Sequence, residues 1–540
     1  MSDNLIEFSP SAYQYPLLLK HLLHYPMVHA PDQEIVYRDL RRHSYRVFRE
    51  RIGRLASGLS QIGVKAGDVV AVLDWDSHRY LECYFAVPMM GGVLQTANLS
   101  LPPEQLLYAM NDAGPSVVLV NADFLPLMEK IADKLPSVRK YVMLHDRKEQ
   151  PTTRLPIECE YEEMLEANSP FFQFPDFDEN TRATTFHTTG TTGRPKGVYF
   201  SHRQLVLHTL AIAAEYGPAP SQGRIHRDDV YMPLTPMFHV HAWGSPYLYT
   251  MMGNKQVYPG RYAPDVLLGL IAREGVTSTH CVPTILQMLL SAPGSKDVDL
   301  SKLKMVVGGS AMPRALVRAA LERGIDVFTG YGQSESCPML TGVHLGKKQL
   351  SEGPELQIER RAAAGLPAPL VDLRIVDADM AEVPHDGETR GEIVARAPWL
   401  TMGYLNDPGA SEQLWAGGYL HTGDVATWDA DGYIHIVDRI KDIISEKSGV
   451  VKAAVIAVKD AKWGERPMAL VVVEPGFAGG GAEAAEEAIR AHVKTYVDRG
   501  VISKFAIPDR VMIVKELPLT SVGKVDKAVL RERHLREEAA

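Results

Sequence analysis

The chain has 540 residues, a formal net charge of −9, 45% hydrophobic residues and 23% charged residues. This length exceeds what a single hydrophobic core usually supports, so two or more domains are expected. The composition is that of an ordinary soluble globular protein. The acidic balance argues against a nucleic-acid partner, because no basic surface would attract phosphate backbones.

The cysteines and the hydropathy of the chain indicate the cellular compartment in which the protein is expected. Cys83, Cys159, Cys281 and Cys337 show no CxxC pair or other metal spacing, which favours a reduced, cytoplasmic environment. The amino terminus lacks a basic segment followed by an apolar run, and the longest apolar stretch, residues 83–94, is too short to span a bilayer. We therefore expect no transmembrane segment, while a peripheral membrane contact and a homodimer stay open.

The first third of the chain alternates helical and strand patterns. Residues 47–62 place apolar side chains on one helical face, and residues 125–135 follow a similar pattern. Residues 69–73 and 117–120 are short β-rich runs between them. This alternation predicts a layered α/β domain.

The middle third repeats a short apolar strand followed by a loop. The strands are expected near residues 230–232, 276–282, 305–307 and 327–328. Three of these loops contain proline or glycine directly after the strand, at Thr235-Pro236, Gly308-Gly309 and Gly330-Tyr331-Gly332. In open α/β sheets, ligands bind outside the carboxyl ends of such strands.

From about Gly365 the sequence becomes β-rich and punctuated by glycine, and the last hundred residues follow a βαβ-like pattern. Strands are expected at 371–376, 391–395, 433–437, 453–458 and 468–473, a flexible glycine-rich link at 476–481 and a helix at 483–493. We therefore expect an N-terminal domain over residues 1–437, a hinge over 438–442 and a mobile C-terminal domain over 443–540.

One segment carries the most chemical information. It follows a predicted strand, residues 183–187, and reads Thr188-Thr189-Gly190-Thr191-Thr192-Gly193-Arg194-Pro195-Lys196-Gly197. Glycines let the backbone approach an anion, the threonines offer hydroxyls and Lys196 adds positive charge, so the segment predicts a phosphate-binding loop. Its spacing differs from that of a Walker loop, and a flexible turn rich in threonine and glycine is the competing interpretation.

Four further motifs follow in order, at residues 331–335 (Tyr-Gly-Gln-Ser-Glu), 419–424 (Tyr-Leu-His-Thr-Gly-Asp), 438–442 (Asp-Arg-Ile-Lys-Asp) and 518–524 (Pro-Leu-Thr-Ser-Val-Gly-Lys). With the phosphate loop they resemble the motifs of the adenylate-forming superfamily, which includes acyl-CoA synthetases, luciferases and peptide-synthetase adenylation domains. The likeness covers nearly the whole chain. Within the superfamily, the sequence as a whole most resembles short- and medium-chain fatty acyl-CoA synthetases, including the methylmercaptopropionate-CoA ligase type.

The resemblance implies a fold and an activity. The fold is a large N-terminal domain of layered α/β subdomains with a β-rich subdomain, and a small mobile C-terminal α+β domain. The activity is ATP-dependent, AMP-forming ligation of a carboxylic acid to coenzyme A through an acyl-adenylate, with Mg²⁺ bound to the nucleotide. The partners are therefore small molecules: the acid, ATP and coenzyme A.

The resemblance also implies roles for single residues. Glu335 would bind Mg²⁺ together with Thr189, Tyr331 would stack on adenine, and Asp424 would accept hydrogen bonds from the ribose hydroxyls. Lys524 would stabilise charge on the carboxylate and the α-phosphate. The competing interpretations are a solvated loop glutamate, a core tyrosine, a turn aspartate and a surface lysine. The nucleotide contacts are completed by Thr188, Gly190, Thr191, Thr192, Gly193, Lys196, Gly309, Ser310, Ala311, Gly330, Gly332, Gln333, Ser334, Ile436 and Arg439.

The segment Pro236-Met237-Phe238-His239 resembles the acyl-site segment of the family. His239 is expected to border the carboxylate or to gate the acyl tunnel, with a satisfied histidine at a helix start as the alternative. We draw no substrate specificity from His241. The acyl pocket is expected to comprise His239, Val240, Trp243, Gly244, Gly308 and Gly309, and Lys441 is expected to be the hinge residue.

The chain departs from the family pattern after Asp442. Residues 443–449 resemble the end of a helix joined directly to the hinge, so a hairpin and half a helix are missing by comparison. In the family, that hairpin helps to build the pantetheine tunnel. The adenylation motifs are intact, so three alternatives stay open: transfer of the acyl group to another acceptor, a variant impaired in the coenzyme A step, and a silent acid- or nucleotide-binding protein.

Overall fold

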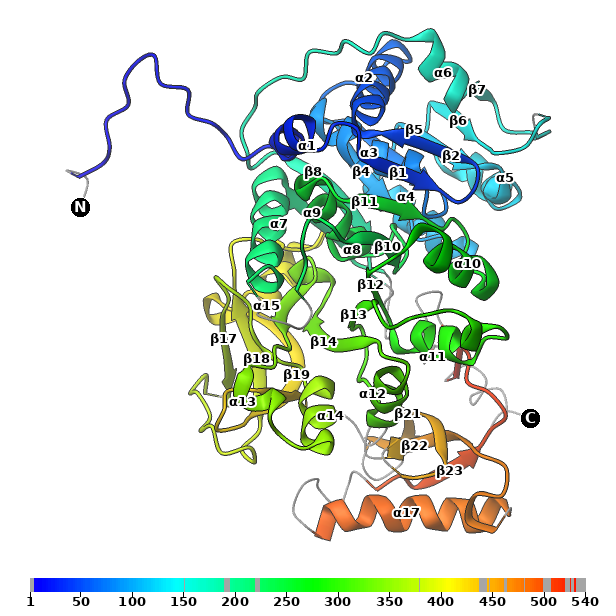
Figure 1. The fold of residues 1–540 in the computed structure, drawn as a ribbon, viewed down its shortest axis with the longest axis vertical. Helices are drawn as coiled ribbons and strands as arrows, with labels where there is room; N and C mark the ends of the chain where they lie inside the picture. Colours follow the sequence, from blue (N-terminus) through cyan, green and yellow to red (C-terminus); the bar gives the residue numbers. More distant parts are fainter. Residues whose placement is uncertain are drawn as a thin grey trace.

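The computed structural model describes residues 4–149, 151–188, 195–218, 224–377, 379–436, 444–445, 447–460, 464–479, 481–498, 507–519, 525 and 529–530. These residues form four β-sheets. Two large sheets carry helices, a four-stranded sheet accompanies them, and a three-stranded sheet with one long helix forms the carboxyl-terminal part (Figure 1). The predicted fold class is confirmed.

The first third of the chain supplies the seven-stranded sheet. Its order is β7 (Ile157–Glu160), β6 (Lys140–Leu144), β5 (Val117–Asn121), β3 (Val69–Leu73), β4 (Val93–Thr96), β8 (Arg182–His187) and β9 (Gly197–Ser201), and only the β8–β9 pair is antiparallel. Its helices are α2 (Tyr45–Gln61), α3 (His78–Met89), α4 (Pro103–Ala113), α5 (Leu125–Ile131) and α6 (Tyr161–Ala167). The predicted helix at 125–135 is too long, because a 3₁₀ turn begins at Ala132.

The nine-stranded sheet comes mainly from the middle third. Its order is β16 (Leu366–Pro367), β15 (Met339–Gly342), β14 (Asp326–Gly332), β13 (Lys304–Val307), β12 (Ser278–Cys281), β10 (Val230–Leu234), β11 (Lys255–Tyr258), β1 (Glu34–Tyr37) and β2 (Arg41–Ser44). Its helices include α7 (His202–Tyr216), α9 (Ser245–Met252), α10 (Pro264–Glu274), α11 (Pro283–Ser291), α12 (Arg314–Glu322) and α14 (Pro354–Ala362). The strands from β14 to β1 are parallel, so their carboxyl ends share one edge.

The last third forms two smaller sheets. The four-stranded antiparallel sheet consists of β17 (Asp372–Val376), β18 (Gly391–Arg396), β19 (Leu420–Trp428) and β20 (Ile434–Ile436). The three-stranded sheet consists of β21 (Val450–Asp460), β22 (Gly464–Val473) and β23 (Arg510–Ile513), with α17 (Ala482–Asp498). β22, α17 and β23 form the predicted βαβ unit, because β22 and β23 are parallel. The predicted flexible link contains a 3₁₀ turn, Phe477–Gly479, and the Phe477 ring packs against Gly449.

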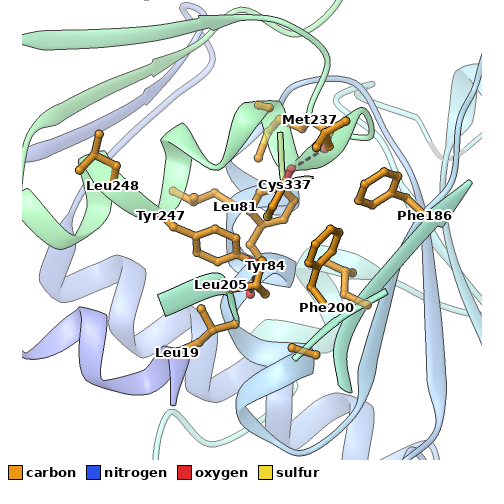
Figure 2. Packing of buried hydrophobic residues seen from close by; sticks show 14 of the residues in the cluster. Leu19, Leu81, Tyr84, Phe186, Phe200, Leu205, Met237, Tyr247, Leu248 and Cys337 are labelled. Atoms are coloured by element: carbon orange, nitrogen blue, oxygen red, sulfur yellow. Dashed lines mark hydrogen bonds between the residues drawn. The ribbon is translucent and has the colours of Figure 1, made fainter. Parts of the chain in front are cut away.

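A buried aromatic core joins the two large sheets (Figure 2). Tyr84 from α3 stacks on Tyr247 from α9 with ring centroids 5.2 Å apart, and Phe186 stacks on Phe200 across β8 and β9 at 5.9 Å. The Tyr84 hydroxyl donates a hydrogen bond to the carbonyl of Met237, just after β10. The loop after β10 is thus fixed against the first sheet. Among the described residues, no helix has both the length and the apolar character needed to cross a membrane.

Candidate active site

The predicted site residues of the middle third lie at the carboxyl ends of adjacent parallel strands. Thr235 and Pro236 follow β10, Gly308 follows β13, and Gly330 to Gly332 end β14. Gly309, Ser310 and Ala311 are exposed on the loop after β13. The sheet edge therefore collects these residues, as expected for a ligand site in an open α/β sheet.

The base of the predicted phosphate loop is closed by two hydrogen bonds between Thr188, which follows β8, and Lys196, which precedes β9. The Thr188 amide donates to the Lys196 carbonyl at 2.9 Å, and the Lys196 amide donates to Thr188 Oγ1 at 3.3 Å. The next residue must be small, because a Cβ on Gly197 would lie 2.9 Å from the Leu405 Cβ and 3.0 Å from His187 Nε2. Residues 189–194 lie outside the described residues, so the roles of Thr189, Gly190, Thr191, Thr192 and Gly193 stay predictions.

Tyr404 contacts both charged groups predicted for the triphosphate. The Lys196 ammonium lies 4.4 Å from the centroid of the Tyr404 ring, and the Tyr404 hydroxyl donates to Glu335 Oε1 at 2.8 Å. Burial and the Glu335 charge raise the pKa of Tyr404 well above its usual range, so the hydroxyl keeps its proton. The sequence analysis missed this residue; its only signal was an aromatic side chain after Gly403 in a loop.

The adenine and ribose motifs also meet. The Tyr331 hydroxyl, at the end of β14, donates to Asp424 Oδ2 in β19 at 2.8 Å. Both side chains are half-buried, so Tyr331 is not enclosed in the core. A Cβ on Gly332 would lie 1.5 Å from the Pro338 carbonyl oxygen, so the close approach of the backbone there requires glycine. Gln333 caps the short 3₁₀ turn Ser334–Ser336, which contains Glu335.

A second unpredicted residue, Glu392 in β18, contacts the motif at residues 419–424 that is predicted to bind ribose. Its Oε1 accepts a hydrogen bond from the Gly423 amide at 2.9 Å, and its Oε2 lies 2.9 Å from His421 Nδ1. Gly423 has a φ of 71°, which favours glycine. Because Gly423 directly precedes Asp424, Glu392 fixes the backbone that presents the Asp424 carboxylate.

Three predicted residues near the hinge and the carboxyl terminus, Arg439, Lys441 and Lys524, lie outside the described residues. Ile436 is the last residue of β20 and is half-buried, and it pairs with Ala426 of β19. The structure therefore tests neither the hinge nor the predicted lysine.

The acyl-site segment has an unusual backbone. Val240, His241, Ala242 and Trp243 have φ angles of 48°, 54°, 46° and 58°, so four consecutive residues other than glycine are left-handed. Such a conformation costs about 1–2 kcal/mol per residue and persists only where packing enforces it. Gly244 follows with a φ of 72°, and a Cβ there would lie 2.7 Å from the His208 ring.

Close packing brings the predicted acyl-pocket residues together. A Cβ on Gly308 would lie 3.2 Å from the Trp243 ring and 2.9 Å from the Gly330 carbonyl oxygen. The Trp243 ring is 5.1 Å from that of His280. His239 precedes the left-handed turn and is half-buried, and its amide donates to the Pro236 carbonyl. The structure thus joins Trp243, Gly308 and Gly330, and the role of His239 stays a prediction.

Two buried ionisable groups support this segment. Asp76 Oδ1 accepts from the Met237 amide at 2.8 Å and Oδ2 accepts from the Tyr262 hydroxyl at 2.6 Å, and burial raises the pKa of Asp76 to about 7. The His241 ring is fully buried, 5.2 Å from that of Phe186, and burial lowers its pKa to about 3. His241 is therefore neutral at physiological pH.

A cavity of about 450 Å³ lies along β9 but shares only Tyr404 with this set of residues. Its lining includes Arg182, Tyr199 and Arg203. Because no residue predicted to contact a substrate borders this cavity, it does not coincide with the predicted site at the edge of the nine-stranded sheet.

Comparison with known proteins identifies the family. Residues 26–405 match the AMP-binding enzyme family, and residues 439–524 match the AMP-binding enzyme C-terminal domain. The chain belongs to the AMP-binding enzyme family. The predicted resemblance to adenylate-forming enzymes is confirmed, and the five motifs lie within or between the two matched regions.

Several members of this family are similar over nearly their whole length. The chain is 38% identical to a long-chain-fatty-acid–CoA ligase of Thermus thermophilus, covering 92% of this chain and 91% of that one. It is 36% identical to a 3-methylmercaptopropionyl-CoA ligase of Ruegeria lacuscaerulensis (96% and 97%) and 35% identical to a medium-chain-fatty-acid–CoA ligase of Ectopseudomonas oleovorans (90% and 89%). These names agree with the predicted enzyme class.

A solved structure with the same fold is that of ATP-bound MatB from Rhodopseudomonas palustris. It superposes with a TM-score of 0.78 at 25% identity, covering 96% of this chain and 99% of that one. The arrangement of sheets is therefore that of a nucleotide-binding member of the family.

Proposed function

We propose that the protein is an AMP-forming, ATP-dependent ligase that joins a carboxylic acid to coenzyme A, and that the acid is a short- or medium-chain fatty acid or a related acid. One observation carries the proposal. Residues predicted for phosphate, Mg²⁺, adenine and ribose are linked in pairs, Lys196 to Glu335 through Tyr404 and Tyr331 to Asp424 directly. A nucleotide with its metal needs such a set of contacts in one place.

The proposed reaction has two steps. First, a carboxylate oxygen attacks the α-phosphorus of ATP, the bond to the β-phosphate oxygen breaks, and pyrophosphate leaves. Then the thiolate of coenzyme A attacks the acyl carbonyl carbon and AMP leaves. Lys196 and the phosphate loop would bind the phosphates, and Lys524 would stabilise the charge that develops in the first step.

Mg²⁺ fits the proposed site by its chemistry. Mg²⁺ prefers oxygen ligands and is usually held by one or two carboxylates together with substrate phosphates. Glu335 offers one half-buried carboxylate, whose Oε1 is already oriented by Tyr404, and Thr189 would add a hydroxyl. Bound there, the ion would neutralise charge on the leaving pyrophosphate.

Packing at the acyl side supports a narrow substrate site. A Cβ on Gly308 would lie 3.2 Å from the Trp243 ring, and the loop before His239 is fixed by contacts of Asp76 and Tyr84 with Met237. The acids in the names of the relatives range from 3-methylmercaptopropionate to long-chain fatty acids. We place this protein toward the shorter end of that range.

We further propose a division into residues 1–437, a hinge at 438–442 with Lys441 as its pivot, and a mobile domain over 443–540. Rotation about Lys441 would exchange the adenylation and thioester arrangements. A cytoplasmic location and a homodimer complete the proposal.

A second candidate acceptor follows from the sequence after Asp442. The family resemblance predicts that the hairpin that helps to build the pantetheine tunnel is absent after Asp442, and β21 begins at Val450. An enzyme that adenylates an acid and passes the acyl group to an amine or a carrier protein would retain every contact described above.

Pyrophosphate release across a panel of carboxylic acids, with and without coenzyme A, tests both candidates. The proposal predicts release that depends on a short- or medium-chain acid, with coenzyme A consumed in equal amount to the AMP formed. Release without any consumption of coenzyme A would favour the second acceptor, and no release with any acid would refute adenylation.

A further inference from the structure

We infer that Tyr404 is a positioning residue that keeps the phosphate-loop lysine and the magnesium-binding carboxylate apart and oriented until MgATP binds. The inference rests on the proposed function of Lys196 and Glu335. It adds a residue that belongs to none of the five motifs and assigns it a role in preparing the site for the nucleotide.

Lys196 and Glu335 each contact a different part of the Tyr404 side chain. The Lys196 ammonium lies over the Tyr404 ring at 4.4 Å, and the hydroxyl of the same ring donates to Glu335 Oε1 at 2.8 Å. Among the described residues, no ion pair joins Lys196 to Glu335. The aromatic ring thus stands where a direct lysine–glutamate contact would otherwise form.

This arrangement allows Lys196 and Glu335 to contact phosphate and Mg²⁺ without first breaking an ion pair between them. A direct pair between the lysine and the half-buried carboxylate would occupy both groups that the nucleotide and its metal need, and it would have to be broken on binding. A cation over an aromatic face is held more weakly and is easily drawn to phosphate. The hydroxyl orients Glu335 through one oxygen, as outer partners of metal-binding carboxylates usually do, and leaves Oε2 for the ion.

The backbone around Tyr404 is fixed independently of any substrate. The Tyr404 amide donates to Ser411 Oγ at 2.8 Å, and the Leu405 amide donates to the Gly197 carbonyl at 2.7 Å. On the other side, the Thr401 amide donates to the Glu335 carbonyl at 2.8 Å. The same short segment therefore ties the loop of Glu335 to the strand that follows Lys196, and the Tyr404 side chain is set between them.

Two substitutions separate the ring from the hydroxyl. Tyr404→Phe keeps the face under Lys196 and removes the hydrogen bond to Glu335, whereas Tyr404→Leu removes both. ATP binding is measured by isothermal titration calorimetry at a series of Mg²⁺ concentrations, without acid or coenzyme A. Tyr199→Phe, a hydroxyl deletion in the neighbouring strand β9, is the matched control, and thermal unfolding checks the fold of each variant.

For Tyr404→Phe we expect about a tenfold rise in the Mg²⁺ concentration needed for half-maximal ATP binding, with ATP affinity in the absence of Mg²⁺ unchanged. For Tyr404→Leu we expect a larger rise and weaker ATP binding at every Mg²⁺ concentration, because Lys196 is then free to pair with Glu335. Adding Lys196→Met to Tyr404→Leu should lower the Mg²⁺ requirement again, since the competing cation is gone.

Three results would overturn the inference. They are a Mg²⁺ requirement in Tyr404→Phe equal to that of the wild type, identical behaviour of the phenylalanine and leucine variants, and a wild-type protein that binds no MgATP. Should the leucine variant fail to fold, the phenylalanine variant alone decides. Wild-type protein that binds MgATP but forms no AMP with any acid would refute the proposed function and leave the result on Tyr404 standing.

Discussion

The nucleotide side and the acyl side of the site are built in different ways. On the nucleotide side, half-buried polar groups contact one another through single hydrogen bonds, as Tyr331 does with Asp424 and Tyr404 with Glu335. On the acyl side, buried rings and a strained left-handed turn are held by packing, with Gly308 and Gly244 where a side chain would clash. The first arrangement suits recognition of charge and hydroxyl groups, as proposed for the nucleotide, and the second suits recognition of shape, as proposed for the acid.

This contrast explains how one fold can serve many acids. The polar contacts suit one invariant cosubstrate and require particular residue types at particular places. A pocket shaped by packing changes with each side chain that borders it, and one methylene changes discrimination by only about 1–3 kcal/mol. Substitutions on the two sides should therefore alter different kinetic constants.

The largest effect is expected on the nucleotide side, from a residue of the C-terminal part. Lys524→Ala should lower the rate of pyrophosphate release about a hundredfold or more, because one donor to developing charge is worth about 2.7–4 kcal/mol. Thioester formation from supplied acyl-adenylate should be spared. Equal losses in both half-reactions, or an unchanged rate of pyrophosphate release, would refute a specific role of Lys524 in adenylation.

On the acyl side, buried histidines should make stability depend on pH. The pKa of His241 is lowered to about 3 by burial, and that of the neighbouring His208 is lowered to about 3 as well, whereas an unfolded histidine titrates near 6.5. Between these values the unfolded state binds more protons, so the free energy of unfolding falls as the pH drops below 6.5.

His241→Phe removes one of these groups and should flatten that decline by about 1 kcal/mol per pH unit between pH 7 and pH 5, because the unfolded histidine is only partly protonated over much of that range. Urea unfolding between pH 7 and pH 5 measures the slope. His385→Phe is a matched control, because that ring stacks on Trp428 but is half exposed. Parallel slopes for wild type and His241→Phe would mean that His241 can be protonated in the folded protein.

A single methyl group should separate the two sides kinetically. Gly308→Ala places a Cβ 3.2 Å from the Trp243 ring and 2.9 Å from the Gly330 carbonyl oxygen, so we expect kcat/KM for the acid to fall about tenfold, with a smaller rise in the KM for ATP through Gly330. Gly269→Ala in α10 is the control, since nothing lies within 4 Å of its added methyl. A rise in the KM for ATP alone would place Gly308 on the nucleotide side.

The smallest effect is expected from Glu392, which acts through Asp424. Glu392→Ala should reduce the preference for ATP over 3′-deoxy-ATP about threefold to tenfold, because the Gly423 amide loses its acceptor and the Asp424 carboxylate is less well placed. Glu392→Gln retains an acceptor oxygen and should recover most of the preference. Equal loss in both variants would point to the His421 contact instead.

The contrast between polar contacts and packing also explains which features could be predicted from the sequence. The threonine- and glycine-rich segment predicted Lys196 as a phosphate contact, and the family resemblance implied Glu335, Tyr331 and Asp424. The parallel strands that carry or precede several of them follow from short apolar runs. Tyr331 and Asp424 meet although 93 positions separate them along the chain, a contact that only the family resemblance implied.

The remaining features depend on tertiary packing. Tyr404 and Glu392 contact site residues through a loop and a strand with no local signature. The left-handed turn at 240–243 contradicts the intrinsic preference of its residues, and the sequence offers no glycine to mark it until Gly244. Likewise, strand β1 joins β11 across more than two hundred residues, a pairing that local periodicity cannot encode.

Transfer of isotope from the acid to the nucleotide tests adenylation most directly. An acid labelled with ¹⁸O in both carboxylate oxygens is incubated with ATP, Mg²⁺ and coenzyme A, and the nucleotide product is analysed by mass spectrometry. Attack of the carboxylate on the α-phosphorus predicts AMP that carries one ¹⁸O atom in its phosphate. Unlabelled AMP, or ADP accompanied by labelled inorganic phosphate, would contradict the account.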